Sequence, residues 1–144
     1  MAHQETAESK IIWGIGRFFK NLFSGSGAKS RKDIINRQEI AERWDTIETM
    51  LKSGGPSHFQ TAVIDADKLL DYCLKSLSAR GETMGERLKS SEDKFHSRDS
   101  YQAAWEAHKE RNRIVHEHDY EFLHHQAKAA INNFEKALRG LGAL

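Results

Sequence analysis

An arginine, an asparagine and a histidine lie close together in the segment 111–116 (RNRIVH). The guanidinium group of Arg111 offers a fork of N–H donors that fits phosphate or carboxylate oxygens. The imidazole of His116 can exchange a proton near neutral pH and act as a general base or acid. On a helix, Asn112 and His116 share a face, whereas Arg111 and His116 are about 140° apart. These residue types suit the binding of an anion with a proton transfer beside it.

The helix that we predict around this segment, residues 99–117, has an inward face that turns polar towards its end. His108 lies in the middle of that face, and Asn112 lies beside it. A buried polar group without a partner costs about 1–3 kcal/mol, so we expect partner side chains, a cleft or another subunit here. His108 is then either an ordinary buried histidine or a residue that holds the side chains of the site in place. The apolar residues that we expect to point inward with it are Tyr101, Ala104, Trp105 and Val115.

Asp67 lies at the edge of the apolar face of another predicted helix, residues 57–79. A carboxylate in such a place needs a cationic partner if it is buried. Arg111 or His116 could be that partner, and Asp67 would then orient the site residue. The alternative is a boundary residue whose carboxylate oxygens lie in water.

The whole sequence is typical of an all-helical protein. Apolar residues recur at helical spacing in every predicted segment, and we find no alternating pattern typical of a strand. Long helices with short loops favour an antiparallel bundle of four long helices and one short helix. We therefore predict an N-terminal amphipathic helix and flexible linker in residues 1–32 and the bundle in residues 33–144. The predicted helices span residues 10–23, 33–52, 57–79, 83–89, 99–117 and 119–141.

Several residues are typical of helix ends. Ser57 with Gln60, and Thr83 with Glu86, have the spacing of capping boxes. Further expected end residues are Asp99 with Gln102, Asp119 as the start of the last helix, and Gly140 as its C-cap.

Composition excludes some classes of protein. Of 144 residues, 22 are Lys or Arg and 21 are Asp or Glu, so the net charge of +1 predicts no global affinity for nucleic acid. A single cysteine, Cys73, excludes an internal disulfide and a cysteine-based zinc site, and it fits a reducing, cytoplasmic location. It lies on an apolar stripe and should fill the core. We predict no metal site, because the five histidines between residues 108 and 125 lack ligand spacing; they are His108, His116, His118, His124 and His125.

The segment 111–116 resembles the Arg-x4–6-His motif of HEPN domains, in the variant in which Asn follows the Arg. HEPN domains are helical bundles of about this size, and their motif lies where one long helix ends before the last one. The resemblance covers about residues 33–141. The segments 62–74 (AVIDADKLLDYCL) and 127–138 (AKAAINNFEKAL) are also similar to small HEPN-like proteins.

This resemblance implies a metal-independent endoribonuclease that acts as a homodimer through its motif face. His116 would take a proton from a ribose 2′-hydroxyl, Arg111 would hold the phosphate, and Asn112 would orient these groups. No cofactor is implied, and the setting would be that of a toxin, with a protein antitoxin as partner, or of a defence protein. The residues that we expect to contact RNA are Lys109, Arg113 and His118.

Two other functions stay open. A HEPN-like module without catalytic activity would bind RNA, a nucleotide or a protein partner. A membrane-peripheral protein would use the predicted helix 10–23, in which Lys10, Arg17 and Lys20 lie opposite a face of Phe, Ile and Trp residues. The same helix could instead pack within the protein or its oligomer.

Overall fold

The computed structural model describes residues 35–144. The predicted helix 10–23 and the predicted domain boundary at residue 32 lie outside this range. Within it, every regular element is helical, which confirms the all-helical prediction for this part of the chain. The elements are α3 (Arg37–Ser53), α4 (Pro56–Ser76), α5 (Met84–Lys89), the short 3-10 helix η1 (Glu92–Lys94), α6 (Arg98–His116) and α7 (His124–Gly140).

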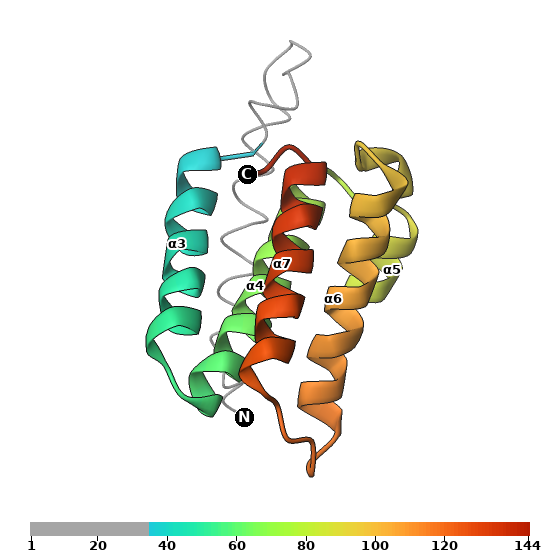
Figure 1. Cartoon of the computed structure of the whole chain (residues 1–144). Coiled ribbons are helices and arrows are strands. Elements are labelled where there is room, and N and C mark those ends of the chain that lie inside the picture. The colour runs from blue at the N-terminus through green and yellow to red at the C-terminus, as the bar shows by residue number, and fades with distance from the viewer. Residues whose placement is uncertain (1–34) are drawn as a thin grey trace, which may run out of the picture. The chain divides into compact units, whose positions relative to one another are not determined.

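The helices α3, α4, α6 and α7 lie along one another, and their directions alternate along the chain (Figure 1). The last helix, α7, packs against both α4 and α6, while α3 packs mainly on α4. The short helix α5 lies beside α6 at the edge of this group (Figure 1). No helix in the described range is long and apolar enough to cross a membrane.

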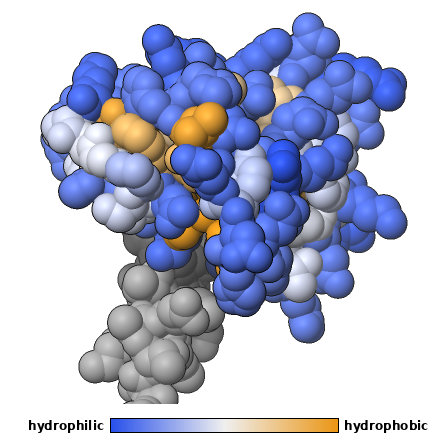
Figure 2. Space-filling view, turned by 60° about the horizontal axis from the view of Figure 1, so that its bottom comes forward, coloured by the Kyte–Doolittle hydropathy of each residue, from blue (hydrophilic) through white to orange (hydrophobic). Residues whose placement is uncertain are grey.

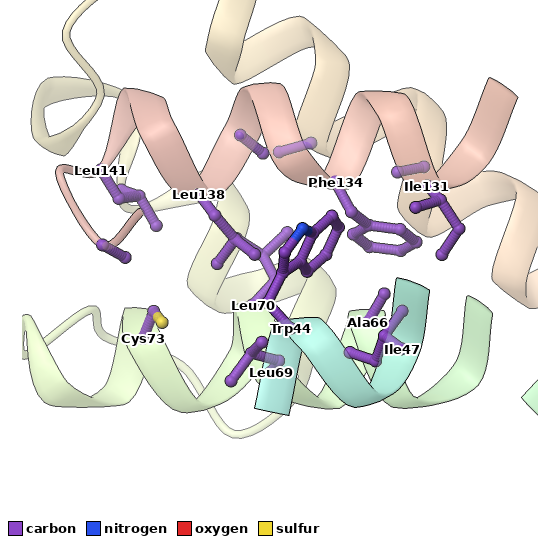
Figure 3. Packing of buried hydrophobic residues seen from close by; sticks show 14 of the residues in the cluster. Trp44, Ile47, Ala66, Leu69, Leu70, Cys73, Ile131, Phe134, Leu138 and Leu141 are labelled. Carbon is purple, nitrogen blue, oxygen red and sulfur yellow. The ribbon is translucent and has the colours of Figure 1, made fainter. Parts of the chain in front are cut away.

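The core consists of the apolar stripes of these helices. Trp44 of α3 points between α4 and α7, towards Leu70 and Phe134 (Figure 3). Burying a side chain of this size stabilises the fold by roughly 1.5–3 kcal/mol, so contacts of this kind hold the helices together. Cys73 is completely buried among them, as predicted, and burial raises the pKa of its thiol to about 12. This thiol is core packing, because a nucleophilic cysteine needs an accessible thiolate.

One predicted capping box forms and the other does not. The Thr83 hydroxyl accepts a hydrogen bond from the Glu86 backbone N–H at 3.2 Å, and Glu86 accepts one from Thr83 in return, which confirms this start of α5. The predicted cap at Ser57 is wrong, because α4 begins one residue earlier, at Pro56. Proline is favoured at the first helical position, since it lacks the N–H that would remain unpaired there.

The ends of α6 and α7 also differ from the predictions. Ser97, not Asp99, caps α6 by accepting a hydrogen bond from the backbone of Ser100 at 3.1 Å. The last helix begins at His124 rather than Asp119, after a non-helical connection over residues 117–123. Buried Phe122 fixes this connection in the core. The backbone N–H of Leu123 then finds an acceptor in the side chain of Gln126, so the helix starts there.

Gly140 lies inside α7 and is not its C-cap; Leu141 is. The glycine matters for packing instead, because a Cβ at this position would lie 2.3 Å from the Cβ of Ser100 on α6. A residue larger than glycine would therefore push α6 and α7 apart.

Candidate functional site

Two residues far apart in the sequence meet in the interior. Asp67 of α4 is 4% exposed and His108 of α6 is 8% exposed. The Nδ1 atom of His108 lies 2.8 Å from Oδ1 of Asp67. A carboxylate this well buried must be paired, and the imidazole N–H is its closest partner.

Arg111 and Asn112 complete the group. The Nη1 atom of Arg111 donates to Oδ1 of Asn112 at 3.1 Å, and Nδ2 of Asn112 lies 3.3 Å from Nε2 of His108. The Nε atom of Arg111 lies 3.5 Å from Oδ2 of Asp67. Hydrogen bonds therefore run from Asp67 through His108 and Asn112 to Arg111, which lies beside Asp67 again, and we call these four side chains the Arg111 cluster.

Arg111 is only loosely bound within this cluster. Its Nε atom is within ion-pairing distance of Asp67, yet it is the one buried side-chain nitrogen or oxygen of residues 35–144 without a hydrogen bond. The Arg111 side chain is 28% exposed, and five N–H donors are available to a guanidinium group. One donor binds Asn112. Part of the guanidinium group therefore faces solvent, where it can meet an anion.

His116 lies apart from this cluster. It is the last residue of α6, it is exposed, and the helix stays regular up to it. The separation of about 140° between Arg111 and His116 is therefore kept, and a single chain does not bring the two groups together.

Val115, beside His116, was predicted to point inward, and this prediction is wrong: it is 42% exposed. The last turn of α6 lies at the end of the bundle, next to the connection 117–123 (Figure 1), so no core remains for Val115 to enter. Leu123 at the start of α7 is similarly exposed. Figure 2 shows this end of the molecule, where a few apolar groups lie among mostly hydrophilic ones.

The three residues expected to contact RNA are all exposed, but two already have acidic partners. Lys109 lies 3.1 Å from Glu106. Arg113 lies 3.4 Å from Glu110, and its guanidinium group also covers the ring of Tyr120 at 4.5 Å. The pair of Lys109 and Glu106 is fully exposed and therefore weak, so Lys109 could still turn to a phosphate. Arg113 is held more firmly, because Glu110 is half-buried. His118 lies in the connection 117–123.

A hollow of about 190 Å³ lies between α6 and α7, away from the Arg111 cluster. Glu106 and Glu110 line it together with the amides of Gln126 and Asn133. Two carboxylates repel a phosphate group, so this hollow does not suit RNA. Among residues 35–144, no three His, Cys, Asp or Glu side chains are placed to hold a metal ion.

The sequence indicated some of these contacts and missed others. Arg111 was one of the two partners suggested for Asp67, and the structure places it there. The shorter contact, from His108 to Asp67, was missed. The available signal was that both residues lie on inward faces of their helices, where each needs a partner.

Comparisons with protein-family models, curated proteins and solved structures found no match to this chain.

Proposed function

We propose that this chain is a HEPN-like, metal-independent endoribonuclease that works as a homodimer. The observation that supports this most is the arrangement of Arg111. Its guanidinium group is held beside a buried carboxylate while part of it stays exposed, on the same end of α6 as the exposed His116. A cation held in this way is suited to bind a phosphate and to stabilise the charge that develops on it.

The reaction needs one base and one cation. His116 accepts the proton of a ribose 2′-hydroxyl, and the 2′-oxygen attacks the adjacent phosphorus. The bond from phosphorus to the 5′-oxygen breaks, and a protonated imidazole returns a proton to that oxygen. The products are a 2′,3′-cyclic phosphate and a 5′-hydroxyl. Arg111 holds the phosphate oxygens throughout, while Asn112 keeps Arg111 in place.

Two copies of the chain are part of this proposal. Arg111 and His116 point to different sides of α6 in one chain, so neither can serve the same phosphate as the other without a large change of the helix end. A second copy packed on the motif face would supply His116 to the Arg111 of the first copy.

The test is cleavage of structured RNA by the full chain in excess EDTA. We expect cleavage to fall at least roughly 100-fold in His116→Ala and in Arg111→Ala, because each removes one essential group. His125→Ala is the matched control, since His125 is exposed at the start of α7 and lies outside the motif. No cleavage by the wild type, or equal cleavage by His116→Ala, would contradict the proposal.

A second candidate is a module that binds RNA or a nucleotide without cleaving it. The observation that favours it is the same separation of His116 from Arg111 within one chain. Binding of labelled RNA, measured by fluorescence anisotropy, would then weaken in Arg111→Ala and stay unchanged in His116→Ala, with no cleavage by either.

A further inference from the structure

Arg111 at one end of the hydrogen-bonded cluster and Asp67 at the other determine which atom donates in each hydrogen bond between them. Arg111 can only donate, so Asn112 must turn its Oδ1 atom towards it. The Nδ2 group of Asn112 then points to Nε2 of His108, which must accept and therefore carries no proton. The proton of the neutral imidazole is left on Nδ1, facing the carboxylate of Asp67. With this assignment, each hydrogen bond of the cluster pairs one donor with one acceptor.

We propose that Asp67 and His108 are positioning residues for Arg111. Their hydrogen bonds hold the amide of Asn112 in one orientation, and this amide keeps the outer N–H groups of Arg111 directed to solvent, where a phosphate group can bind. The phosphate part rests on the proposed function, whereas the fixed imidazole and amide do not.

The distances favour positioning over a simple ion pair. Asp67 makes its short contact, 2.8 Å, with His108, and it lies 3.5 Å from Arg111, outside hydrogen-bond geometry. A purely structural pair would bring the carboxylate and the guanidinium fork together in a bidentate contact. Here the carboxylate binds the imidazole closely and leaves Arg111 with donors to use elsewhere.

The orientation of Arg111 depends on the protonation of His108. If Nε2 carried the proton, it would meet the Nδ2 group of Asn112, donor against donor. The amide would turn over, and Nδ2 would then face the Nη1 donor of Arg111. The guanidinium group could not stay where it is.

The first test is a long-range proton–nitrogen NMR correlation of the imidazole rings in the full chain, without RNA. We expect His108 to carry its proton on Nδ1 alone. In Asn112→Asp both ring nitrogens face carboxylates, so we expect both to be protonated. A proton on Nε2 in the wild type, or an unchanged ring in Asn112→Asp, would overturn the proposal, whatever the chain does to RNA.

The second test compares two replacements of His108. Glutamine can donate to Asp67 and accept from Asn112, whereas leucine can do neither. We expect His108→Gln to keep most of the RNA turnover and His108→Leu to lose at least roughly tenfold in kcat, with KM little changed. If the chain binds RNA without cleavage, the same order applies to affinity. Equal behaviour of the two variants, with both folded, would overturn the proposal.

A matched pair of aspartates on α4 controls for charge. Asp67→Asn should reduce turnover or affinity as His108→Leu does. Its one oxygen can still accept from His108, but an NH2 donor then replaces the oxygen beside the Nε donor of Arg111. Asp65→Asn should change neither, because Asp65 is exposed and paired only with Lys68 at 3.8 Å. An equal loss in both variants would show a general charge effect and would overturn the proposal.

Discussion

Two aspartates of α4, one helical turn apart, each lie next to an arginine from another helix. Asp71 binds Arg87 of α5 through both oxygens, at 2.6 and 3.1 Å. Asp67 lies 3.5 Å from Arg111 of α6 and makes no hydrogen bond with it. The two pairs therefore have the same composition and very different geometry.

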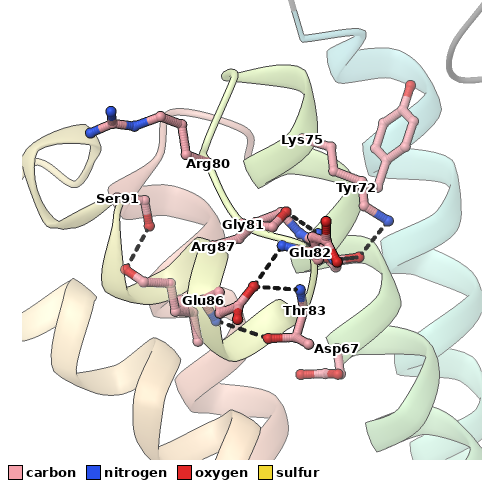
Figure 4. A network of polar contacts seen from close by, with 12 residues as sticks. Asp67, Tyr72, Lys75, Arg80, Gly81, Glu82, Thr83, Glu86, Arg87 and Ser91 are labelled. Carbon is pink, nitrogen blue, oxygen red and sulfur yellow. Dashed lines mark hydrogen bonds and ion pairs between the residues drawn. The ribbon is translucent and has the colours of Figure 1, made fainter.

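The pair of Asp71 and Arg87 is complete within the protein. The Nη1 atom of Arg87 also donates to the carbonyl of Gly81 at 2.8 Å, and Lys75 adds a second cation 2.7 Å from Asp71. The Arg87 side chain is only 9% exposed. Figure 4 shows this network, with Asp67 drawn nearby and outside it. All three guanidinium nitrogens of Arg87 are used to hold α5 and the turn before it on α4.

Arg111 differs in both respects: it is 28% exposed, and one of its buried donors has no hydrogen bond. An incompletely paired arginine at a helix end is what a binding site needs and what a purely structural contact avoids. The difference between the two clusters, rather than the presence of an ion pair, is the reason to propose Arg111 and not Arg87 as the binding residue.

The largest expected effect is on stability, in Arg87→Met. This change leaves Asp71 nearly buried with only Lys75 beside it, and removing one partner of a buried pair is strongly destabilising. We expect the free energy of unfolding to fall by about 3 kcal/mol, measured by urea denaturation. The proposed function predicts that RNA turnover of the folded fraction stays unchanged. A loss below that of Arg111→Met would contradict the assignment of Arg87 as structural.

Arg111→Met should show the reverse of Arg87→Met, with a small effect on stability and a large effect on the proposed activity. Arg111 makes one hydrogen bond, from its charged guanidinium group to a neutral amide, and a long ion pair, so we expect a loss of about 1.5 kcal/mol in the free energy of unfolding. The proposed function predicts that RNA turnover or affinity nevertheless falls far more than in Arg87→Met. Equal stability losses in the two variants would remove the distinction between the clusters.

The smallest effect concerns pH and the start of α5, which carries Arg87. Hydrogen bonds from the backbone N–H groups of Glu82 and Thr83 hold the pKa of the Glu86 carboxyl below its usual value. A lowered pKa in the folded state means that this carboxylate stabilises the fold above its unfolded-state pKa, about 4.3. The contribution is lost as pH falls through the folded-state value.

The stability difference between the wild type and Glu86→Gln should therefore shrink between pH 7 and pH 3, measured by urea denaturation at each pH. Thr83→Ala is the control, because it removes the uncharged half of the same capping box. It should cost about 1 kcal/mol at both pH values. A difference for Glu86→Gln that grows in acid would contradict the sign of the pKa shift.

Part of the candidate site could be predicted from local spacing. His108 and Asn112 lie four residues apart on one helix, so their proximity follows from helical geometry. The wrong helix ends, at Ser57, Asp99 and Asp119, show the limit of such reasoning. Several residues can cap the same helix, and the choice depends on which of them the packed structure leaves in reach of the free backbone N–H groups.

Within residues 35–144, the helices and the apolar stripes of the core follow from the sequence, because helical spacing is a local property of the chain. The contact of Asp67 with His108, 41 residues away, and the full pairing of Arg87 rather than Arg111 do not. Burial and hydrogen-bond geometry depend on which helices come into contact, and this is fixed only when the chain is packed. The same pair of charges becomes a structural contact where both groups are enclosed and well aligned, and a candidate binding site where one of them still faces water.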